Sequence, residues 1–137
     1  MGSLNLTILP SAEEIAKAIA KRDRAKLLPS GSYAQYVLGL STQLPLRLVY
    51  YTDSKSRTVE VGNRTIQFKN TSTKILALKG TISKLVVLAL RDIGRGKVTL
   101  KGEEKIIELL QKEDIKDLKH DIVLAPQWIA EIMAKAL

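Results

Sequence analysis

The chain has 137 residues, a formal net charge of +8 and 45% hydrophobic residues. It has no cysteine and one histidine, which excludes disulfides, iron–sulfur clusters, zinc ribbons and multi-histidine metal centres, so we expect no metal and no cofactor. No uncharged apolar run is long enough to span a bilayer and no secretory signal is recognised, so we expect a cytoplasmic protein without a membrane partner.

The first expected element is an amphipathic helix from Ser11 to about Arg22. Ser11 and Glu14 match a capping box, in which each side chain satisfies a free backbone N–H at the helix start.

A chain of this size buries one ordinary core, so we expect a single domain over residues 4–137. We interpret residues 1–3 as a remnant of cloning.

A short strand is expected at residues 25–28, ending before Pro29. Ser30 then has the position of an N-cap, and Gly39 ends the short helix that follows. The apolar residues of this helix recur at helical spacing at Tyr33, Tyr36, Val37 and Leu40.

A β-rich run at residues 46–52 precedes the clearest local signal of the chain. Two runs of β-forming residues flank Gly62-Asn63, which predicts a β-hairpin over about residues 57–69 with a two-residue turn. The expected register places Val59 opposite Ile66 on one face, and Glu60 opposite Thr65 and Thr58 opposite Gln67 on the other.

Residues 74–78 fit either a further strand or the lead into the next helix. Residues 81–93 form a helix that is apolar almost all round, which is typical of a central core helix. Helices are expected at about 102–111, 114–119 and 126–137. Because strands and helices do not alternate strictly, the sequence predicts an α+β fold, with a small hairpin-containing sheet, several helices and a helical C-terminal half.

Positive charge is concentrated in the centre of the chain. Residues 61–100 carry eight Lys or Arg and one acidic residue, whereas residues 101–137 carry a net charge of −2. Cations on a protruding hairpin can lie along a phosphate backbone. The candidate DNA contacts are Arg47, Arg57, Arg64, Lys69 and Lys74. The alternative is a basic face that docks an acidic protein without nucleic acid.

Few residues suit catalysis. Residues 94–97 (GRGK) resemble the end of a phosphate-binding loop, but Arg91 and Val98 break the pattern, so a helix stop with solvated cations is the favoured interpretation. His120 beside Asp121 fits a general base, a contact with the last helix carbonyls or a solvent-facing histidine. We name no catalytic residue and expect no enzyme.

Trp128 is the only tryptophan and follows Pro126 at the start of the last helix. It either completes the core or forms an exposed anchor for a partner. Large aromatic side chains are mostly buried, which favours the core.

Three stretches together resemble one protein family. They are PSGSYA at 29–34 with LGLSTQLP at 38–45, VYYTDSKSRTV at 49–59 with VGNRTIQFK at 61–69, and LAPQWIA at 124–130. They resemble the C-terminal domain of the AbiEi-like (abortive-infection) antitoxins of type IV toxin–antitoxin systems, which also act as transcriptional repressors. The resemblance covers roughly residues 9–137.

The resemblance implies a non-enzymatic domain that a winged-helix DNA-binding domain normally precedes. It also implies a toxin partner of the nucleotidyltransferase-like type, encoded nearby. The winged helix is absent from this sequence. We therefore expect an antitoxin or transcriptional-regulator domain that contributes toxin neutralisation and contacts the DNA backbone. A protein-interaction domain without nucleic acid is the alternative.

Overall fold

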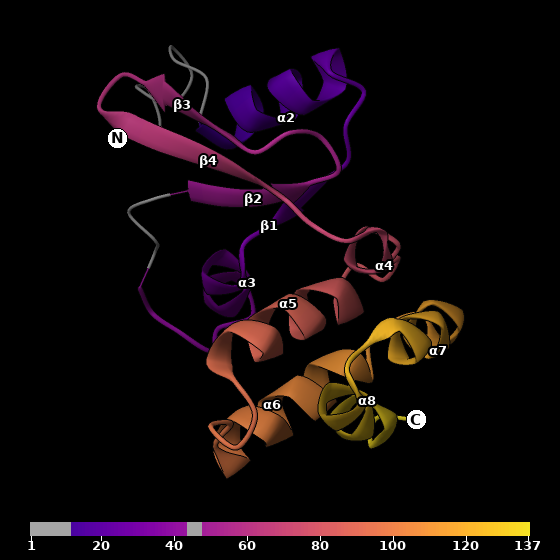
Figure 1. Cartoon of the computed structure of the whole chain (residues 1–137). Coiled ribbons are helices and arrows are strands. Elements are labelled where there is room, and N and C mark those ends of the chain that lie inside the picture. The colour runs from indigo at the N-terminus through magenta and orange to yellow at the C-terminus, as the bar shows by residue number, and fades with distance from the viewer. Residues whose placement is uncertain (1–11, 44–47) are drawn as a thin grey trace.

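The computed structural model describes residues 12–43 and 48–137. Within these ranges the chain forms a small α+β domain with seven helices and one four-stranded mixed sheet, which confirms the expected fold class (Figure 1). The elements in chain order are α2 (Ala12–Arg22), β1 (Leu27–Pro29), α3 (Gly31–Val37), β2 (Leu48–Thr52), β3 (Arg57–Val61), β4 (Arg64–Asn70), α4 (Thr73–Leu76), α5 (Ser83–Ile93), α6 (Leu100–Leu110), α7 (Ile115–Leu124) and α8 (Gln127–Ala134).

The hairpin of β3 and β4 has the predicted register. Val59 lies opposite Ile66, and the pairs of Thr58 with Gln67 and of Glu60 with Thr65 are also formed. Gly62 has a φ of +62°, which a type II′ turn requires at its first central residue. Turn chemistry within the chain is therefore sufficient to set this pairing.

The rest of the sheet contains a pairing that the sequence did not indicate. The strand order is β1-β2-β4-β3, in which β2 and β4 are parallel and the other neighbours are antiparallel. Residues 53–63 connect the two parallel strands, and β3 belongs to this connection. Strand β3 lies at the outer edge of the sheet, next to β4. The hairpin turn after β3 therefore leads the chain back to the position between β3 and β2, where β4 pairs with both.

Helices cover both faces of the sheet (Figure 1). Helix α2 lies on one face, and α3 and α5 lie on the side of the other. The small core under α2 contains Ala16, Tyr50, Ile66 and Phe68. On the opposite face, Leu28 of β1 and Tyr51 of β2 join the main core, which the helices form.

Helix α5 is the central helix, as predicted from its apolar sequence. Five consecutive residues, Val86 to Leu90, are buried. Helix α3 packs closely against α5 because Gly31 has no side chain. A Cβ at this position would lie 2.7 Å from the carbonyl oxygen of Leu88 and would overlap the Cβ of Asp92.

The C-terminal half is helical, as expected. Ile129, Ile132 and Met133 of α8 are buried, at the spacing of one helix face. Helix α7 extends to Leu124, five residues beyond the expected end at Lys119.

The run at 74–78 is resolved in favour of a helix, α4, which begins after Ser72 and buries Ile75 and Leu76. Pro29 was expected to stop the first strand but is its last residue. In α3, Tyr36 and Val37 are 40% and 49% exposed, and the helix packs through Gly31 and Ala34 instead.

Candidate nucleic-acid interface

The basic segment, residues 61–100, keeps its positive charge in the folded protein. Its eight cations are Arg64, Lys69, Lys74, Lys79, Lys84, Arg91, Arg95 and Lys97. Across the described parts of the chain, none of these eight is in an ion pair. The only acidic group of the segment, Asp92, accepts hydrogen bonds from Gln35 Nε2 (2.6 Å) and Ser32 Oγ (3.5 Å).

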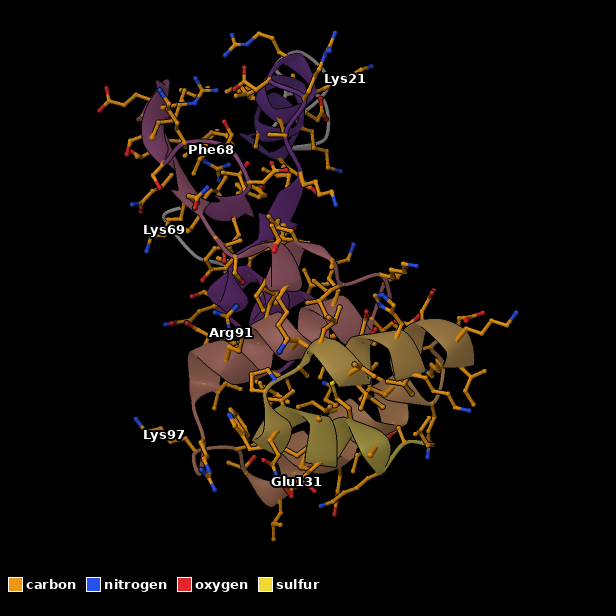
Figure 2. All side chains as sticks on the ribbon, turned by 45° about the vertical axis from the view of Figure 1, so that its right-hand side comes forward. Lys21, Phe68, Lys69, Arg91, Lys97 and Glu131 are labelled. Atoms are coloured by element: carbon orange, nitrogen blue, oxygen red, sulfur yellow. The ribbon has the colours of Figure 1, made fainter. Side chains whose placement is uncertain are left out.

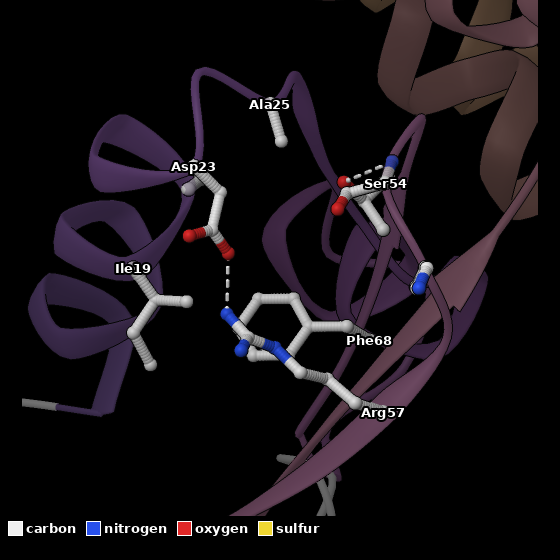
Figure 3. A pocket seen from close by; sticks show the side chains of 9 residues that line it. Ile19, Asp23, Ala25, Ser54, Arg57 and Phe68 are labelled. Carbon is white, nitrogen blue, oxygen red and sulfur yellow. Dashed lines mark hydrogen bonds and ion pairs between the residues drawn. The ribbon is translucent and has the colours of Figure 1, made fainter.

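Arg57, a candidate DNA contact, is held by an intramolecular contact (Figure 3). Its guanidinium donates to Asp23 Oδ2 at 2.5 Å and lies 5.7 Å from the centre of the Phe68 ring. These contacts join the C-terminal end of α2 to the first residue of β3. The partly exposed guanidinium therefore has an anionic partner already, which weakens its attraction for a phosphate.

The hollow beside Arg57 is too small for a ligand. Residues of α2, β2 and β4 line it, and its free volume is about 10 Å³, which is no more than one water molecule needs.

Arg64 and Lys69 are both exposed, but they do not share a face of the sheet. Ile66 and Phe68 are buried under α2, so the alternation of a strand places Arg64 on the α2 face and Lys69 on the other. They are also about 17 Å apart along β4, at roughly 3.3 Å per residue. Lys74 is exposed on α4, and Arg47 lies outside the described residues. The five candidates therefore do not form one patch.

A second group of cations, outside the predicted contacts, lies at the end of α5 and in the loop after it. Arg91 lies in the last turn of α5, and Arg95 and Lys97 lie in the loop that leads to α6. Figure 2 shows Lys69, Arg91 and Lys97 following one another down one side of the molecule. We call these three exposed residues the basic stripe. For Arg95 and Lys97, the signal in the sequence is the GRGK run at residues 94–97, for which a helix stop is the favoured interpretation.

The helix stop itself is confirmed, because α5 ends at Ile93 and Gly94 is its C-cap. Gly94 and Gly96 have φ values of +100° and +79°, which residues with a side chain rarely adopt. The two glycines therefore shape the loop that presents Arg95 and Lys97.

Asp121 is the centre of a buried polar cluster. It is fully buried and accepts hydrogen bonds from the Ser83 hydroxyl, from the backbone N–H groups of Lys79 and Gly80 (both 2.8 Å) and from His120 Nδ1 (2.9 Å). Burial by itself raises the pKa of Asp121, but the hydrogen bonds from Ser83, His120, Lys79 and Gly80 outweigh it and hold the pKa below its usual value.

Glu113 adds a second carboxylate to the same helix end. Its Oε2 accepts from the backbone N–H groups of Ile82 (2.6 Å) and Ser83 (2.7 Å). Glu113 therefore satisfies two free N–H groups at the start of α5, whose own N-cap residue provides no side-chain bond. Asp121 holds the Ser83 hydroxyl and the backbone just before the helix. The function of this cluster in the fold is to cap the central helix.

The same cluster contains a serine, a histidine and an aspartate, but their arrangement differs from a catalytic triad. The Ser83 hydroxyl donates to Asp121 rather than to His120, and Ser83 is fully buried. A triad requires the imidazole between the hydroxyl and the carboxylate. His120 therefore bonds to the capping carboxylate, an interaction that the sequence did not indicate.

Trp128 is half-buried and packs against the main core. It is the second residue of α8, and Pro126 lies just before the helix as its N-cap. Its contact with the core agrees with the interpretation that Trp128 completes the core. Because Trp128 is also partly exposed, its contact with a partner stays a prediction.

The described residues contain no group of three or more His, Cys, Asp or Glu side chains that could hold a metal ion. Within the same ranges, none of the helices has the length and apolar character that crossing a membrane requires.

The fold and this surface define a small α+β domain with an unpaired basic segment. The chain belongs to a protein family whose model matches residues 2–118 and which is described as a family of unknown function (DUF6088). No curated protein and no solved structure gives a significant match.

Proposed function

We propose that this domain is a non-enzymatic part of an antitoxin-like transcriptional regulator and that it contacts the phosphate backbone of DNA. The observation that carries the proposal is the basic segment, whose eight cations are without an ionic partner among the described residues. Unpaired cations can exchange their counterions for phosphates, which is the main source of sequence-independent affinity.

The basic stripe is the part of this surface best suited to a backbone. Lys69, Arg91 and Lys97 come from a strand, a helix and a loop, and they project along one side of the molecule (Figure 2). Base stacking is a weaker alternative, because Tyr50 and Phe68 are buried and Tyr36 is the one aromatic residue among the exposed large side chains of the described chain. We therefore expect weak, sequence-tolerant binding with a steep dependence on salt.

The test is a salt series of fluorescence anisotropy on a short duplex of random sequence. Replacing the three stripe residues by glutamine should lower the magnitude of the log–log salt slope by about 2.7, at roughly 0.9 for each phosphate contact. The control replaces Lys112, Lys116 and Lys119, which are exposed at the other end of α6 and on α7, by glutamine. This control changes the net charge equally and should leave the slope within error of the unmodified protein.

An equal change of slope in both triple variants would show a general charge effect and would remove the stripe from the interface. No binding of the unmodified protein to DNA at low salt would contradict the proposal. In that case the same cations would favour the alternative, a domain that docks an acidic protein.

The toxin part of the proposal is supported by the three family-like stretches. In the fold they form the start of α3 with the segment after it, the sheet from β2 to β4, and the corner between α7 and α8. A nucleotidyltransferase-like protein encoded next to the gene of this protein is the expected toxin. Co-expression of the two should relieve the growth arrest that this neighbour causes alone, and growth arrest that persists would contradict this part.

A further inference from the structure

A hollow lies where the end of α3, the end of α5 and the start of α6 meet. Its free volume is about 210 Å³, whereas the hollow beside Arg57 has about 10 Å³. An engineered cavity of about 150 Å³ binds benzene, so this space is large enough for a six-membered ring with a small substituent. The lining residues are Leu40, Ile93, Lys97, Val98, Thr99, Gly102 and Ile106.

Four of the lining side chains are aliphatic, and they come from two separate parts of the chain. Leu40 follows α3, Ile93 ends α5, and Val98 and Ile106 come from the loop and from α6. Aliphatic walls of this kind favour an apolar body over a hydrated one.

Local hydrogen bonds fix the segments that line the hollow. Thr99 Oγ1 accepts the backbone N–H of Gly102 at 2.9 Å, which caps α6 and fixes the loop beside the hollow. Gly102 contributes only backbone to the wall, and a Cβ there would lie 3.0 Å from Thr99 Oγ1. Lys105 Nζ donates to the carbonyl oxygen of Gly39 at 3.0 Å. This bond connects α6 to the segment after α3, which contains Leu40.

The charged residue in the wall of the hollow is a cation. Lys97 is exposed and lines the hollow, and Arg95 lies two residues earlier in the same loop. Among the described residues Lys97 is in no ion pair, and Glu103, next to Gly102, is bound to Lys135 Nζ at 2.6 Å. An anion at Lys97 therefore displaces no ionic partner.

We propose that this hollow binds a small organic carboxylate, with its cyclic or branched hydrocarbon body between the aliphatic walls and its carboxylate at Lys97. Both parts of the ligand have a counterpart in the site. The body replaces water in a space lined by Leu40, Ile93, Val98 and Ile106, and the carboxylate pairs with an ammonium group that has no ionic partner in the described part of the chain. This function goes beyond the contact with DNA, although Lys97 also belongs to the basic stripe and would be shared by a bound carboxylate and a DNA phosphate.

The test is a titration of the folded protein, followed by the backbone amide signals of residues 96–102 in NMR spectra. The probes are cyclohexanecarboxylate, its neutral analogue cyclohexylmethanol, and inorganic phosphate. We expect saturable shifts with the carboxylate, weaker binding of the alcohol and no saturable shift with phosphate. If cyclohexylmethanol bound as tightly as the carboxylate, Lys97 would have no role in binding. If phosphate caused the same saturable shifts as the carboxylate, the site would bind anions without using its aliphatic walls.

Two kinds of variant test the two parts separately. Lys97→Gln should weaken the carboxylate about two- to fivefold, as an exposed ion pair does, and Lys119→Gln on α7 should leave the affinity unchanged. Val98→Phe should fill the hollow and abolish saturable binding while keeping the charge. Ile93→Phe serves the same purpose if the first filling variant does not fold.

Undiminished affinity in a folded filling variant would overturn the proposal. The DNA experiment fails or succeeds independently, because Val98→Phe and Ile93→Phe change no charge and should keep the salt slope of DNA binding.

Discussion

The carboxylate of Asp121 in α7 accepts the hydroxyl hydrogen of Ser83 in the first turn of α5, across 38 positions of sequence. Both residues are fully buried. The same carboxylate also accepts the backbone N–H groups of Lys79 and Gly80. The start of the central helix is therefore held by a residue from the C-terminal half.

Replacing Asp121 by alanine should lower the free energy of unfolding by about 3 kcal/mol or more. The substitution leaves several buried donors without an acceptor, and hydrogen bonds to a charged group contribute about 1.5–3 kcal/mol each. Glu108→Ala on the exposed side of α6 is the control and should change stability by less than about 0.5 kcal/mol. Urea denaturation measures both, and equal midpoints would show that the cluster contributes nothing.

The same cluster predicts a dependence of stability on acid. The pKa of Asp121 is lower in the folded protein than its usual value of 3.8, so the unfolded chain takes up the proton more readily. This stabilisation is fully present above the unfolded value and is lost as the pH falls through the folded value. In denaturation curves between about pH 2 and pH 6, the stability advantage of the unmodified protein over Asp121→Asn should shrink towards low pH. A constant difference would contradict this assignment.

Gly80→Ala should destabilise the protein by about 1–3 kcal/mol, the usual cost of inserting atoms into a packed site. A Cβ at this position would lie 2.5 Å from Glu113 Oε2 and would overlap the Ser83 hydroxyl. Thr81→Ala, one residue later and exposed, is the matched control and should have little effect. A shift of the thermal midpoint no larger than that of the control would mean that the two carboxylates can move away at little cost.

Leu88→Ala should cost about 2–5 kcal/mol, because Leu88 is 2% exposed within the central helix. Leu85 belongs to the same helix but is only half-buried, so Leu85→Ala should cost less. Chemical denaturation of the two variants tests the orientation of α5. The reverse order of the two effects would show that the helix is rotated.

Arg57 should contribute to stability rather than to DNA binding. A double-mutant cycle of Arg57→Gln and Asp23→Asn should give a coupling energy of about 0.2–1 kcal/mol, the range for exposed pairs. Arg57→Gln by itself should leave the salt slope of DNA binding unchanged. A fall of the slope by about 0.9 would return Arg57 to the interface.

The parts of the fold that could be predicted from the sequence are those whose cause lies within a few residues. The hairpin register follows from Gly62 and the alternating residues beside it, and the Ser30 cap follows from its own side chain, which accepts the Tyr33 N–H. The parallel pairing of β2 with β4 depends on where the β3 connection runs, which no local pattern specifies. The side chains that hold Ser83 at the start of α5 come from Glu113 and Asp121, which are 30 and 38 residues away in the sequence.

The candidate interface shows the same division. The surplus of positive charge is a property of composition, so the sequence alone shows it. The separation of Arg64 from Lys69 depends on which side of β4 is covered by α2, and the pairing of Arg57 depends on the turn after α2. The hollow between α3, α5 and α6 has no signal in the sequence, because Leu40 is more than 50 positions away from the rest of its wall, which residues 93–106 form.

The last residue of β1 has a consequence for assembly. Pro29 has no backbone N–H to donate, and β1 is only three residues long, so this margin of the sheet is a poor template for a strand from another molecule. Among the described strands, β3 forms the other margin, and its sequence places Arg57 and Glu60 there, charges that disfavour stacking of strands into fibrils. The domain thus combines a partly apolar sheet with protection against aggregation at both margins.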